Sequence, residues 1–350
     1  MHLKVALLGF GNVGRALASL LIAKNDTLRA EYDLSIRVVG IQTGRHGTAI
    51  DPNGILLNTA LDAVRYGSSL GGLHRGTSIT DSEAFIDACE ADLIFETVPT
   101  NPTDGMPALA YARQILGQGT HLVTANKGPV AFGYKELRQL AAEHGVGFFF
   151  ESTVMDGGPV LSVGREGLPG AEVRQIRGIF NSTTNYILTR MEQEDLSFEA
   201  ALAAAQKIGI AETDPTLDID GWDSSIKTVI LANVLMGSDL RPADVDRTGI
   251  RGMELSDVQA AAEEGKRIRL LCEAWRDDSG KVQARVHPER VPADNVLASV
   301  TGTTSIVDFE TDVLPRLTII EHDPGPKTTA YGMLADMINI VRGRYETQAD

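Results

Sequence analysis

The segment 211–227 concentrates charged side chains of a kind that can move protons. It carries five carboxylates and one lysine: Glu212, Asp214, Asp218, Asp220, Asp223 and Lys227. A helix is expected from about Asp223, so Asp223 and Lys227 are predicted to lie one turn apart on a single face. Neighbouring carboxylates raise the pKa of an ammonium group and burial lowers it, a balance that can tune a lysine for proton transfer. The segment therefore predicts a polar site in which Lys227 transfers a proton.

The same acids also have a purely structural explanation. Carboxylates at a helix N-terminus are stabilised by the helix dipole, and an exposed ion pair one turn apart contributes little to stability. For the segment 211–227 alone this explanation stays open, and the other motifs of the chain must decide.

A glycine-rich turn near the N-terminus predicts a dinucleotide site. The apolar run 3–8 leads into the turn and a helical pattern follows from Arg15; the turn itself is Gly9, Phe10, Gly11, Asn12, Val13 and Gly14. In such a unit the first glycine permits the tight turn, the second lets the backbone approach a pyrophosphate, and the third lets the helix pack on the strand. A tight turn without a ligand is the alternative, and the flanking elements disfavour it.

The end of the next predicted strand, 36–41, bears on the choice of cofactor. The strand runs into Gln42, Thr43, Gly44 and Arg45, with no acid among them. An acid at this place binds the ribose hydroxyls of NAD, whereas an arginine suits the 2′-phosphate of NADP. Arg45 therefore favours NADP, while NAD stays open.

The composition disfavours several other classes of protein. The chain has 350 residues, 43% hydrophobic residues and a net charge of −15, which allows two domains with sizeable cores and disfavours nucleic-acid binding. The apolar runs are too short for a membrane span, and no signal-peptide pattern is present. Cys89 and Cys272 have no metal or redox spacing, so reduced thiols in a cytoplasmic protein are expected. The histidines form no metal-ligand pattern.

Alternating strand and helix patterns predict a doubly wound parallel sheet in the first part of the chain. The further expected elements are strands at 92–97, 121–124 and 147–150, and helices at 107–116, 197–208 and 223–236. After Phe150 the pattern becomes mixed, which indicates a second domain that carries the acidic segment. A last amphipathic helix, 327–342, is expected to return to the first domain.

Four segments, in this order, resemble the homoserine dehydrogenase family, and the resemblance covers nearly the whole chain. They are the turn Gly9–Gly14, the segment Thr120–Pro129, the segment Gly178–Leu188 and the segment Ile210–Lys227. The resemblance implies an oxidoreductase of threonine and methionine biosynthesis. Such an enzyme interconverts L-homoserine and L-aspartate 4-semialdehyde with NAD(P).

The family also implies the fold and the domain organisation. An N-terminal Rossmann-type doubly wound parallel sheet is expected, with an α+β domain for catalysis and dimerisation. We place the first domain at 1–135, completed by the C-terminal segment at about 320–350, and the second at 136–319. A homodimer is implied by the family alone.

Roles for individual residues follow from the resemblance at matching positions. Lys227 matches a proton-transferring lysine, Lys127 a second lysine near the nicotinamide, and Asp223 an acid that orders the site. The implied substrate contacts are Glu212, Asp218, Asp223 and Thr183. The implied cofactor contacts are Gly9, Phe10, Gly11, Asn12, Val13, Gly14, Arg45, Thr97, Lys127 and Gly325. A sodium ion is implied at Glu151, Val154, Asp156 and Gly158, although a tight turn uses the same kind of glycine.

Three departures from the family pattern bear on the substrate. Ser182 stands where the family has glycine, Met155-Asp156 replaces a run of small residues, and the loop 323–327, with Pro324, Gly325 and Pro326, replaces a glycine-rich loop. Ser182 is expected to narrow the pocket or to supply a contact.

Two other functions stay open. One is a related dehydrogenase that acts on another small amino- or hydroxy-acid semialdehyde. The other is a non-catalytic NADPH-binding sensor, which would need neither Lys127 nor Lys227. Without the resemblance, Lys127 would be taken for a solvated turn residue and Thr183 for a residue that satisfies a loop hydrogen bond.

Overall fold

The structure is a computed structural model that describes residues 1–344, and its chain folds into two compact units. Met1–Gly157 and the described residues from Gly325 to Arg344 form the first unit, and Gly158–Pro324 form the second. The predicted boundaries at 135/136 and 319/320 lie inside helix α5 (Lys127–Glu143) and strand β12 (Leu317–Glu321). Positions 345–350 of the predicted C-terminal segment lie outside the described residues.

The first unit is built on a sheet with the strand order β3-β2-β1-β4-β5-β6. Its strands are β1 (His2–Leu8), β2 (Ser35–Thr43), β3 (Gly47–Ile50), β4 (Leu93–Glu96), β5 (His121–Thr124) and β6 (Phe148–Phe149). Its helices are α1 (Asn12–Tyr32), α2 (Leu57–Arg65), η1 (Leu70–Leu73), α3 (Ser82–Ala88), α4 (Ala108–Gly117), α5, η2 (Glu151–Thr153) and α13 (Pro326–Val341).

Parallel pairing in this sheet fits its sequence, because strands buried on both faces are continuous apolar runs. The strands β2, β1, β4, β5 and β6 run parallel, and the edge strand β3 pairs antiparallel with β2. The chain order reverses between β1 and β4. In open α/β sheets a ligand binds at such a point, beyond the carboxyl ends of the strands.

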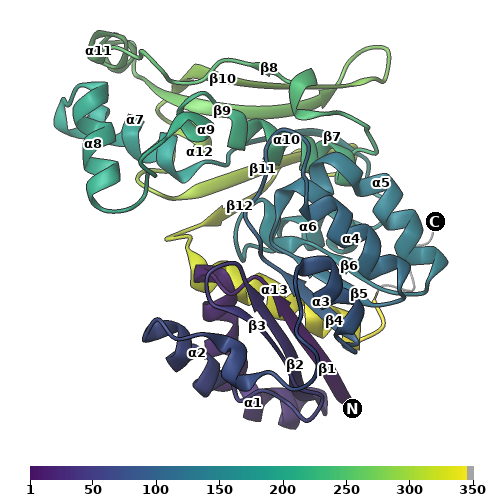
Figure 1. Cartoon of the computed structure of the whole chain (residues 1–350). Helices are drawn as coiled ribbons and strands as arrows, with labels where there is room; N and C mark the ends of the chain where they lie inside the picture. The colour runs from purple at the N-terminus through teal and green to yellow at the C-terminus, as the bar shows by residue number, and fades with distance from the viewer. Residues whose placement is uncertain (345–350) are drawn as a thin grey trace. The chain divides into compact units, whose positions relative to one another are not determined.

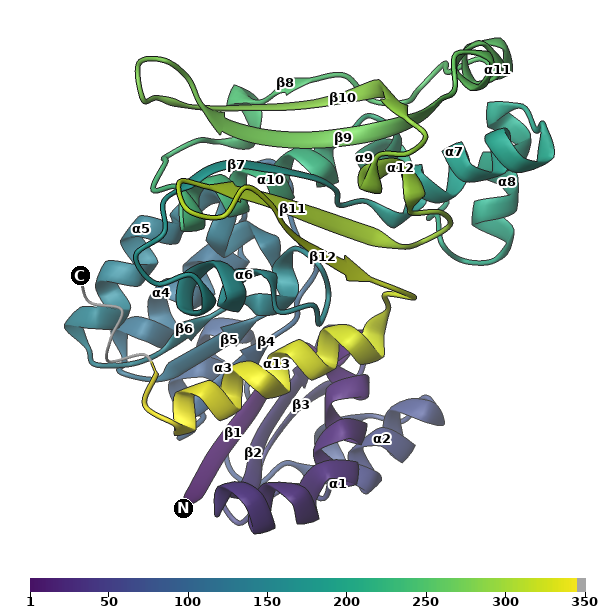
Figure 2. The ribbon, with the colours of Figure 1, turned by 180° about the vertical axis from the view of Figure 1, so that it is seen from behind.

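Helices cover both faces of the first sheet. Figure 2 shows α13 running across one face, where it packs beside α1. Leu17 of α1 and Met333 and Met337 of α13 share one apolar core with Leu7 of β1. On the other face, α4 and α5 pack on each other and on β5 and β6. The doubly wound arrangement predicted from the sequence is therefore confirmed.

The second unit is an α+β fold on a sheet with the order β12-β11-β7-β9-β10-β8. Its strands are β7 (Val173–Ile179), β8 (Asp246–Arg247), β9 (Lys266–Arg276), β10 (Val282–Pro292), β11 (Ser305–Thr311) and β12. Its helices are α6 (Val160–Ser162), η3 (Val163–Gly167), α7 (Ser182–Glu194), α8 (Phe198–Lys207), α9 (Thr216–Ile219), α10 (Trp222–Leu235), η4 (Pro242–Asp244), α11 (Leu255–Glu263) and α12 (Val296–Ser299).

Most of this second sheet is antiparallel. Only β8 and β10 pair in parallel among the pairs of the described residues. Helices α7 and α10 pack on one face of the sheet (Figure 1). In the part of the chain that is described, no helix is long and apolar enough to cross a membrane.

Candidate active site

A cavity of about 860 Å³ opens in the first unit at the carboxyl ends of β1, β2 and β4. Three segments supply much of its lining: the glycine turn 9–12, the end of β2 with the following turn at 42–47, and the turn 97–99 after β4. This is the position at which the reversal of strand order predicts a dinucleotide.

Glycine stands at three positions of the turn for different structural reasons. Gly9 has φ +107°, and a Cβ there would lie 2.5 Å from the Thr97 hydroxyl oxygen. A Cβ on Gly14 would overlap the Gly9 carbonyl, so this glycine lets α1 approach the turn. A Cβ on Gly11 would meet nothing within 4 Å, although Gly11 lines the cavity. Gly9 and Gly14 are needed by the fold, whereas the bare backbone at Gly11 faces open space that a phosphate group fits.

The charges at the start of α1 suit an anion. Gly11 caps this helix without a side-chain hydrogen bond, and the first turn contains no acid. The Arg15 guanidinium donates a hydrogen bond to Asn12 Oδ1 at 2.8 Å, and both residues line the cavity. Free backbone N–H groups, the helix dipole and Arg15 together present positive charge where a pyrophosphate would lie.

Acids also line the cavity on the side of α3. Asp81 caps α3 by accepting a hydrogen bond from the Ala84 N–H at 2.8 Å, and it accepts another from the Thr80 hydroxyl. These bonds lower the pKa of Asp81, the Ala84 bond most. Arg45 is exposed at the end of β2 and also lines the cavity. The cavity therefore offers both a cation and carboxylates to the adenosine end of a dinucleotide.

The predicted cofactor residues divide into two groups. Gly9, Phe10, Gly11, Asn12, Arg45 and Thr97 line the cavity, whereas Val13, Gly14, Lys127 and Gly325 are not among its lining residues. Lys127 is the first residue of α5, whose cap Asn126 accepts a hydrogen bond from the Gly128 N–H at 2.9 Å. Gly325 caps α13, and its N–H donates to the Thr328 hydroxyl at 2.8 Å.

In the second unit, the start of α10 brings the predicted acids and lysine together. Lys227 Nζ lies 3.1 Å from Asp223 Oδ2 and donates to the Phe180 carbonyl at 2.6 Å. The side chains of Lys227 and Asp223 are only 15% and 17% exposed. The pair is thus not the solvated surface pair that the structural explanation requires.

Asn181 joins this pair to Asp218. The Asn181 amide nitrogen donates to Asp218 Oδ1 at 2.6 Å and to Asp223 Oδ2 at 3.0 Å. Its carbonyl oxygen accepts from the Thr184 N–H at 2.9 Å and so caps α7. One side chain therefore holds two carboxylates close together and fixes them to the beginning of a helix.

The electrostatics of Asp218 reflect this crowding. Burial is the largest cause that raises the pKa of Asp218, and the neighbouring charge of Asp223 raises it further. Hydrogen bonds from Asn181 and Thr183 and the charge of Lys227 act in the opposite direction. A cation placed beside Asp218 would lower the pKa of its carboxyl group.

Thr183 and Glu212, two other predicted substrate contacts, lie in different surroundings. Thr183 is buried, and its hydroxyl donates to the Ile210 carbonyl at 3.2 Å besides its bond to Asp218. Glu212 is exposed, and its backbone carbonyl accepts from the Gln206 side chain at 3.1 Å. The structure thus groups Thr183 with Asp218, Asp223 and Lys227, and it shows no contact of the Glu212 carboxylate with them within residues 1–344.

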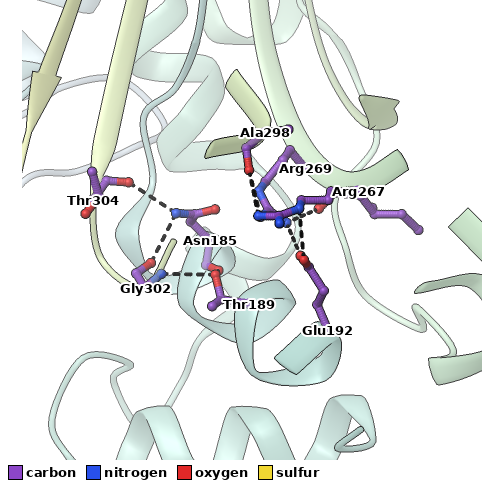
Figure 3. Close-up of polar contacts among 9 residues, drawn as sticks. Asn185, Thr189, Glu192, Arg267, Arg269, Ala298, Gly302 and Thr304 are labelled. Carbon is purple, nitrogen blue, oxygen red and sulfur yellow. Dashed lines mark hydrogen bonds and ion pairs between the residues drawn. The ribbon is translucent and has the colours of Figure 1, made fainter. Parts of the chain in front are cut away.

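Helix α7 is tied along one face to the segment between α12 and β11 (Figure 3). The Asn185 amide donates to the carbonyls of Gly302 and Thr304, both at 3.1 Å, and the Gly302 N–H donates to the Thr189 hydroxyl at 3.0 Å. The Ser182 hydroxyl donates to the Thr303 carbonyl at 3.0 Å. The serine that departs from the family pattern therefore anchors this segment.

The far end of α7 is fixed by buried charge. Arg269 has a fully buried side chain, and its guanidinium donates to Glu192 at 2.9 Å and to the Ala298 carbonyl at 3.2 Å (Figure 3). Arg267 pairs with the same Glu192 at 3.1 Å. Breaking such a buried pair from one side is costly, so the helix that carries Asn181 is held rigidly at both ends.

The residues of the implied sodium site lie around η2 and the turn that follows. Glu151 is buried, and its backbone N–H donates to Asp336 of α13 at 2.9 Å. Val154 is buried, Asp156 has φ +35°, and Gly158 begins the second unit. Among the residues described, no group of three or more His, Cys, Asp and Glu side chains could hold a metal ion. An ion here would depend on Glu151 and backbone carbonyls.

Sequence reasoning missed Asn181, the Phe180 carbonyl and Arg15. Asn181 stands before a helix at a position typical of a cap, but its contacts lie 37 and 42 residues away, and a cap pattern does not predict them. Arg15 directly follows the glycine turn, and its place in the first turn of the predicted helix could have identified it.

Comparison with known proteins gives the same family for both units. A model of the homoserine dehydrogenase NAD-binding domain matches residues 9–151, and a homoserine dehydrogenase model matches residues 159–338. An NAD(+)-dependent homoserine dehydrogenase of Pseudomonas canavaninivorans is 37% identical over 340 residues, 96% of either chain. A homoserine dehydrogenase of Methanocaldococcus jannaschii is 38% identical over 339 residues, 96% of this chain and 98% of that one.

Solved structures show the same relationship. A homoserine dehydrogenase from Thiobacillus denitrificans superposes with a TM-score of 0.84 at 30% identity, over 98% of this chain and 74% of that one. A hyperthermophilic archaeal homoserine dehydrogenase in complex with NADPH superposes with a TM-score of 0.83 at 30% identity, over 97% and 98% of the two chains. The chain therefore belongs to the homoserine dehydrogenase family of NAD(P)-dependent oxidoreductases, which act on a CH–OH group of a small molecule.

Proposed function

We propose that this protein interconverts L-homoserine and L-aspartate 4-semialdehyde, a step of threonine and methionine biosynthesis. The observation that carries the proposal is the mostly buried Lys227, held between Asp223 and the Phe180 carbonyl. A sensor that only bound the dinucleotide would not need this arrangement. The family of the chain supplies the reaction class, and the cluster around Lys227 supplies the proton-transfer group that the reaction needs.

When bound, the nicotinamide dinucleotide supplies the hydride. Lys227 donates a proton to the oxygen on which negative charge develops, so its ammonium stabilises the transition state more than the ground state. Asp223 holds Lys227 in place, and Asp218 and Thr183 contact the substrate. We assign Lys127 to the nicotinamide and the substrate carbonyl, and Glu212 to the substrate ammonium, because both match the family at these positions. In the reverse direction Lys227 accepts the proton.

The cofactor we propose is NADP, with Arg45 binding its 2′-phosphate. The exposed arginine at the end of β2 supports this choice, as does the archaeal relative solved in complex with NADPH. The relative described as NAD(+)-dependent and the carboxylates Asp81 and Glu83 in the same cavity support use of NAD as well. We therefore expect both dinucleotides to bind, NADP more tightly.

A sodium ion is part of the same proposal. Glu151 supplies the buried carboxylate, and the backbone of Val154, Asp156 and Gly158 supplies carbonyl oxygens, ligands that suit a hard cation. Replacement of sodium by a large organic cation at constant ionic strength would lower the thermal stability and the activity. Equal stability and activity in both salts would exclude the ion.

A homodimer in the cytoplasm completes the proposal. The family supports the dimer, and the free, buried Cys89 and Cys272 support a reducing compartment. Sedimentation at working concentration tests the oligomeric state, and a monomer there would exclude the dimer.

Turnover with defined substrates tests the proposed function. Purified protein would oxidise NADPH in the presence of L-aspartate 4-semialdehyde and form homoserine, identified by mass spectrometry. Turnover confined to other small semialdehydes would replace the substrate but keep the reaction class. Cofactor binding without turnover of any semialdehyde would identify a sensor and contradict the proposal.

A further inference from the structure

A carboxylate lies buried directly beneath the dinucleotide cavity. Glu96 is the last residue of β4 and is 0% exposed. It immediately precedes Thr97, Val98 and Pro99, which line the cavity. Within residues 1–344, Glu96 has no cation paired with it, so its negative charge, when present, is balanced only by hydrogen bonds.

The bonds around Glu96 link it to both neighbouring turns. Glu96 Oε1 accepts from the Val98 N–H at 2.7 Å and, more weakly, from the Asn126 amide at 3.5 Å. Glu96 Oε2 accepts from the Thr124 hydroxyl at 2.6 Å. Asn126 also donates to the Val98 carbonyl at 3.0 Å and caps the helix that begins at Lys127. The carboxylate thus couples the floor of the cavity to the start of α5.

The network tolerates Glu96 with or without its proton. The Thr124 hydroxyl is a rotor that both donates and accepts, so it can donate to a carboxylate or accept from a carboxylic acid. Burial raises the pKa of Glu96 to about 7, against the lowering effect of its hydrogen bonds. Protonation would therefore change the charge below the cavity without rearranging the fold.

Few other ionisable groups face Glu96. Its register partners are Leu8 on β1 and Thr124 on β5, neither of which titrates. The start of α5 carries Lys127, and the elements that pack against β5 carry Tyr111 on α4, Asp336 on α13 and Glu151 on η2. The dominant cause of the raised pKa of Glu96 is burial, not any of these charges.

The nicotinamide half of a bound dinucleotide would lie on the β4 side of the cavity. In this type of sheet the pyrophosphate lies at the glycine turn after β1, and the adenosine extends toward the end of β2. The remaining half would extend over the turn after β4, whose residues line the cavity. An oxidised nicotinamide ring is positively charged and a reduced ring is neutral, so a charge below that turn interacts differently with the two forms.

We propose that Glu96 sets which redox form of the dinucleotide this protein prefers. The ionised carboxylate favours the oxidised, cationic form, and the protonated carboxyl favours the reduced, neutral form. Binding and protonation are reciprocal, so binding of the reduced form takes up a fraction of a proton and binding of the oxidised form releases a fraction of a proton. The inference rests on the proposed binding of NADP in this cavity and adds a regulation of that site.

The test is the ratio of the Kd for NADPH to the Kd for NADP⁺, measured by calorimetry between about pH 6 and about pH 8.5. Ionisation of the 2′-phosphate affects both forms equally and cancels in the ratio. In the wild-type protein the ratio would rise with pH, on the order of 10-fold. In Glu96→Gln it would stay at the low-pH value of the wild type, and in Glu90→Gln, which removes an exposed acid, it would follow the wild type.

A second pair of variants separates this role from a structural one. Thr124→Val removes a bond that lowers the pKa of Glu96, so the midpoint of the ratio would move to higher pH, and Thr124→Ser would leave it in place. If Glu96 only supported the fold, Glu96→Gln would change both Kd values together and leave the pH dependence of the ratio intact.

Two outcomes would overturn the inference, and they differ in what else they imply. A wild-type ratio that stays flat while both forms bind would overturn the role of Glu96 and leave the proposed function standing. Failure of both forms to bind would overturn the role of Glu96 and the proposed function together. The wild-type ratio and the proton uptake measured with it decide the matter even if a variant does not fold.

Discussion

Asn181 is the residue on which the geometry of the acidic cluster depends most. Its amide bridges Asp218 and Asp223, two like charges that would otherwise repel, and its carbonyl caps α7. The bridge keeps Asp223 in line with Lys227. Removal of the bridge should therefore affect catalysis more than stability, provided that the cap is kept.

Asn181→Asp and Asn181→Ser separate these two effects. Both replacements can still cap the helix, so the loss of capping should contribute less than about 1 kcal/mol to the change in the free energy of unfolding. Both lose the bridging amide, and the aspartate adds a third carboxylate, so kcat/KM should fall by about 100-fold, further in Asn181→Asp than in Asn181→Ser. Steady-state kinetics beside thermal unfolding would check this, and kcat/KM within a few-fold of wild type would contradict it.

We expect Arg45 to discriminate between the two dinucleotides. A charge-assisted bond to a 2′-phosphate is present only with NADP, so Arg45→Ala should weaken NADPH binding by about 10- to 100-fold. NADH binding should stay the same and serves as the internal control. Equal losses of affinity for NADPH and NADH would show that Arg45 supports the structure of the cavity and does not bind the 2′-phosphate.

At the scale of elements, we expect the strand–turn–helix unit that begins the chain to position the cofactor. Gly14 lets α1 pack on the turn, whereas Gly11 has no neighbour that a Cβ would touch. The fold requires a glycine at position 14, whereas at position 11 we expect the ligand to require it. A matched pair of substitutions can therefore distinguish a fold requirement from a ligand requirement.

Gly11→Ala should leave the free energy of unfolding within about 0.5 kcal/mol of wild type, as is usual for a surface change. The added methyl group would occupy the space of the pyrophosphate, so the Kd for NADPH should rise at least about 10-fold. Gly14→Ala, in contrast, should lower the melting temperature because of its overlap with the Gly9 carbonyl. A destabilised Gly11→Ala with normal NADPH affinity would reverse these assignments.

The elements of the first unit could be predicted because each carries its own signal. The expected strands at 92–97 and 121–124 correspond to β4 and β5, and the helix at 107–116 corresponds to α4. These strands are short, mostly apolar runs, and the turns beside them contain proline or glycine, as at Pro99 and Gly119. The local sequence pattern was therefore sufficient to predict these elements.

The strands of the second unit were not predicted, for a physical reason. β9 and β10 carry charged residues on one face, where Glu273 pairs with both Arg177 and Arg285 across the sheet. Such ion pairs replace the apolar alternation that marks a strand in the sequence. The pairing partners are also far apart along the chain, so a local window does not contain them.

At the scale of the whole molecule, both units of the chain match one family, and the resemblance of the sequence alone predicts the reaction class. It did not give the bridge by Asn181, the anchoring role of Ser182 or the burial of Glu96. Each of these depends on contacts between residues distant in the sequence.

At this scale, the free energy of unfolding of the molecule should depend on pH because of Glu96. Its carboxyl keeps the proton to about pH 7 in the folded protein, whereas in the unfolded chain it releases the proton near its ordinary value of 4.5. The folded state thus binds more protons in this window, and the free energy of unfolding should fall by roughly 3 kcal/mol as pH rises through it.

Denaturant unfolding of the cofactor-free protein between about pH 4.5 and about pH 8 would measure this fall. In Glu96→Gln the fall should be smaller, and in Glu90→Gln it should match the wild type. Identical pH profiles for Glu96→Gln and the wild type would contradict the assignment.

The most direct test of the account is the rate of NADPH oxidation with L-aspartate 4-semialdehyde in two lysine variants. Lys227→Ala should lower kcat by about 10²- to 10⁴-fold, the usual contribution of a positioned general acid, while NADPH still binds. Lys207→Ala, which removes an exposed lysine of α8, should react at the wild-type rate. Undiminished turnover in Lys227→Ala would contradict the account.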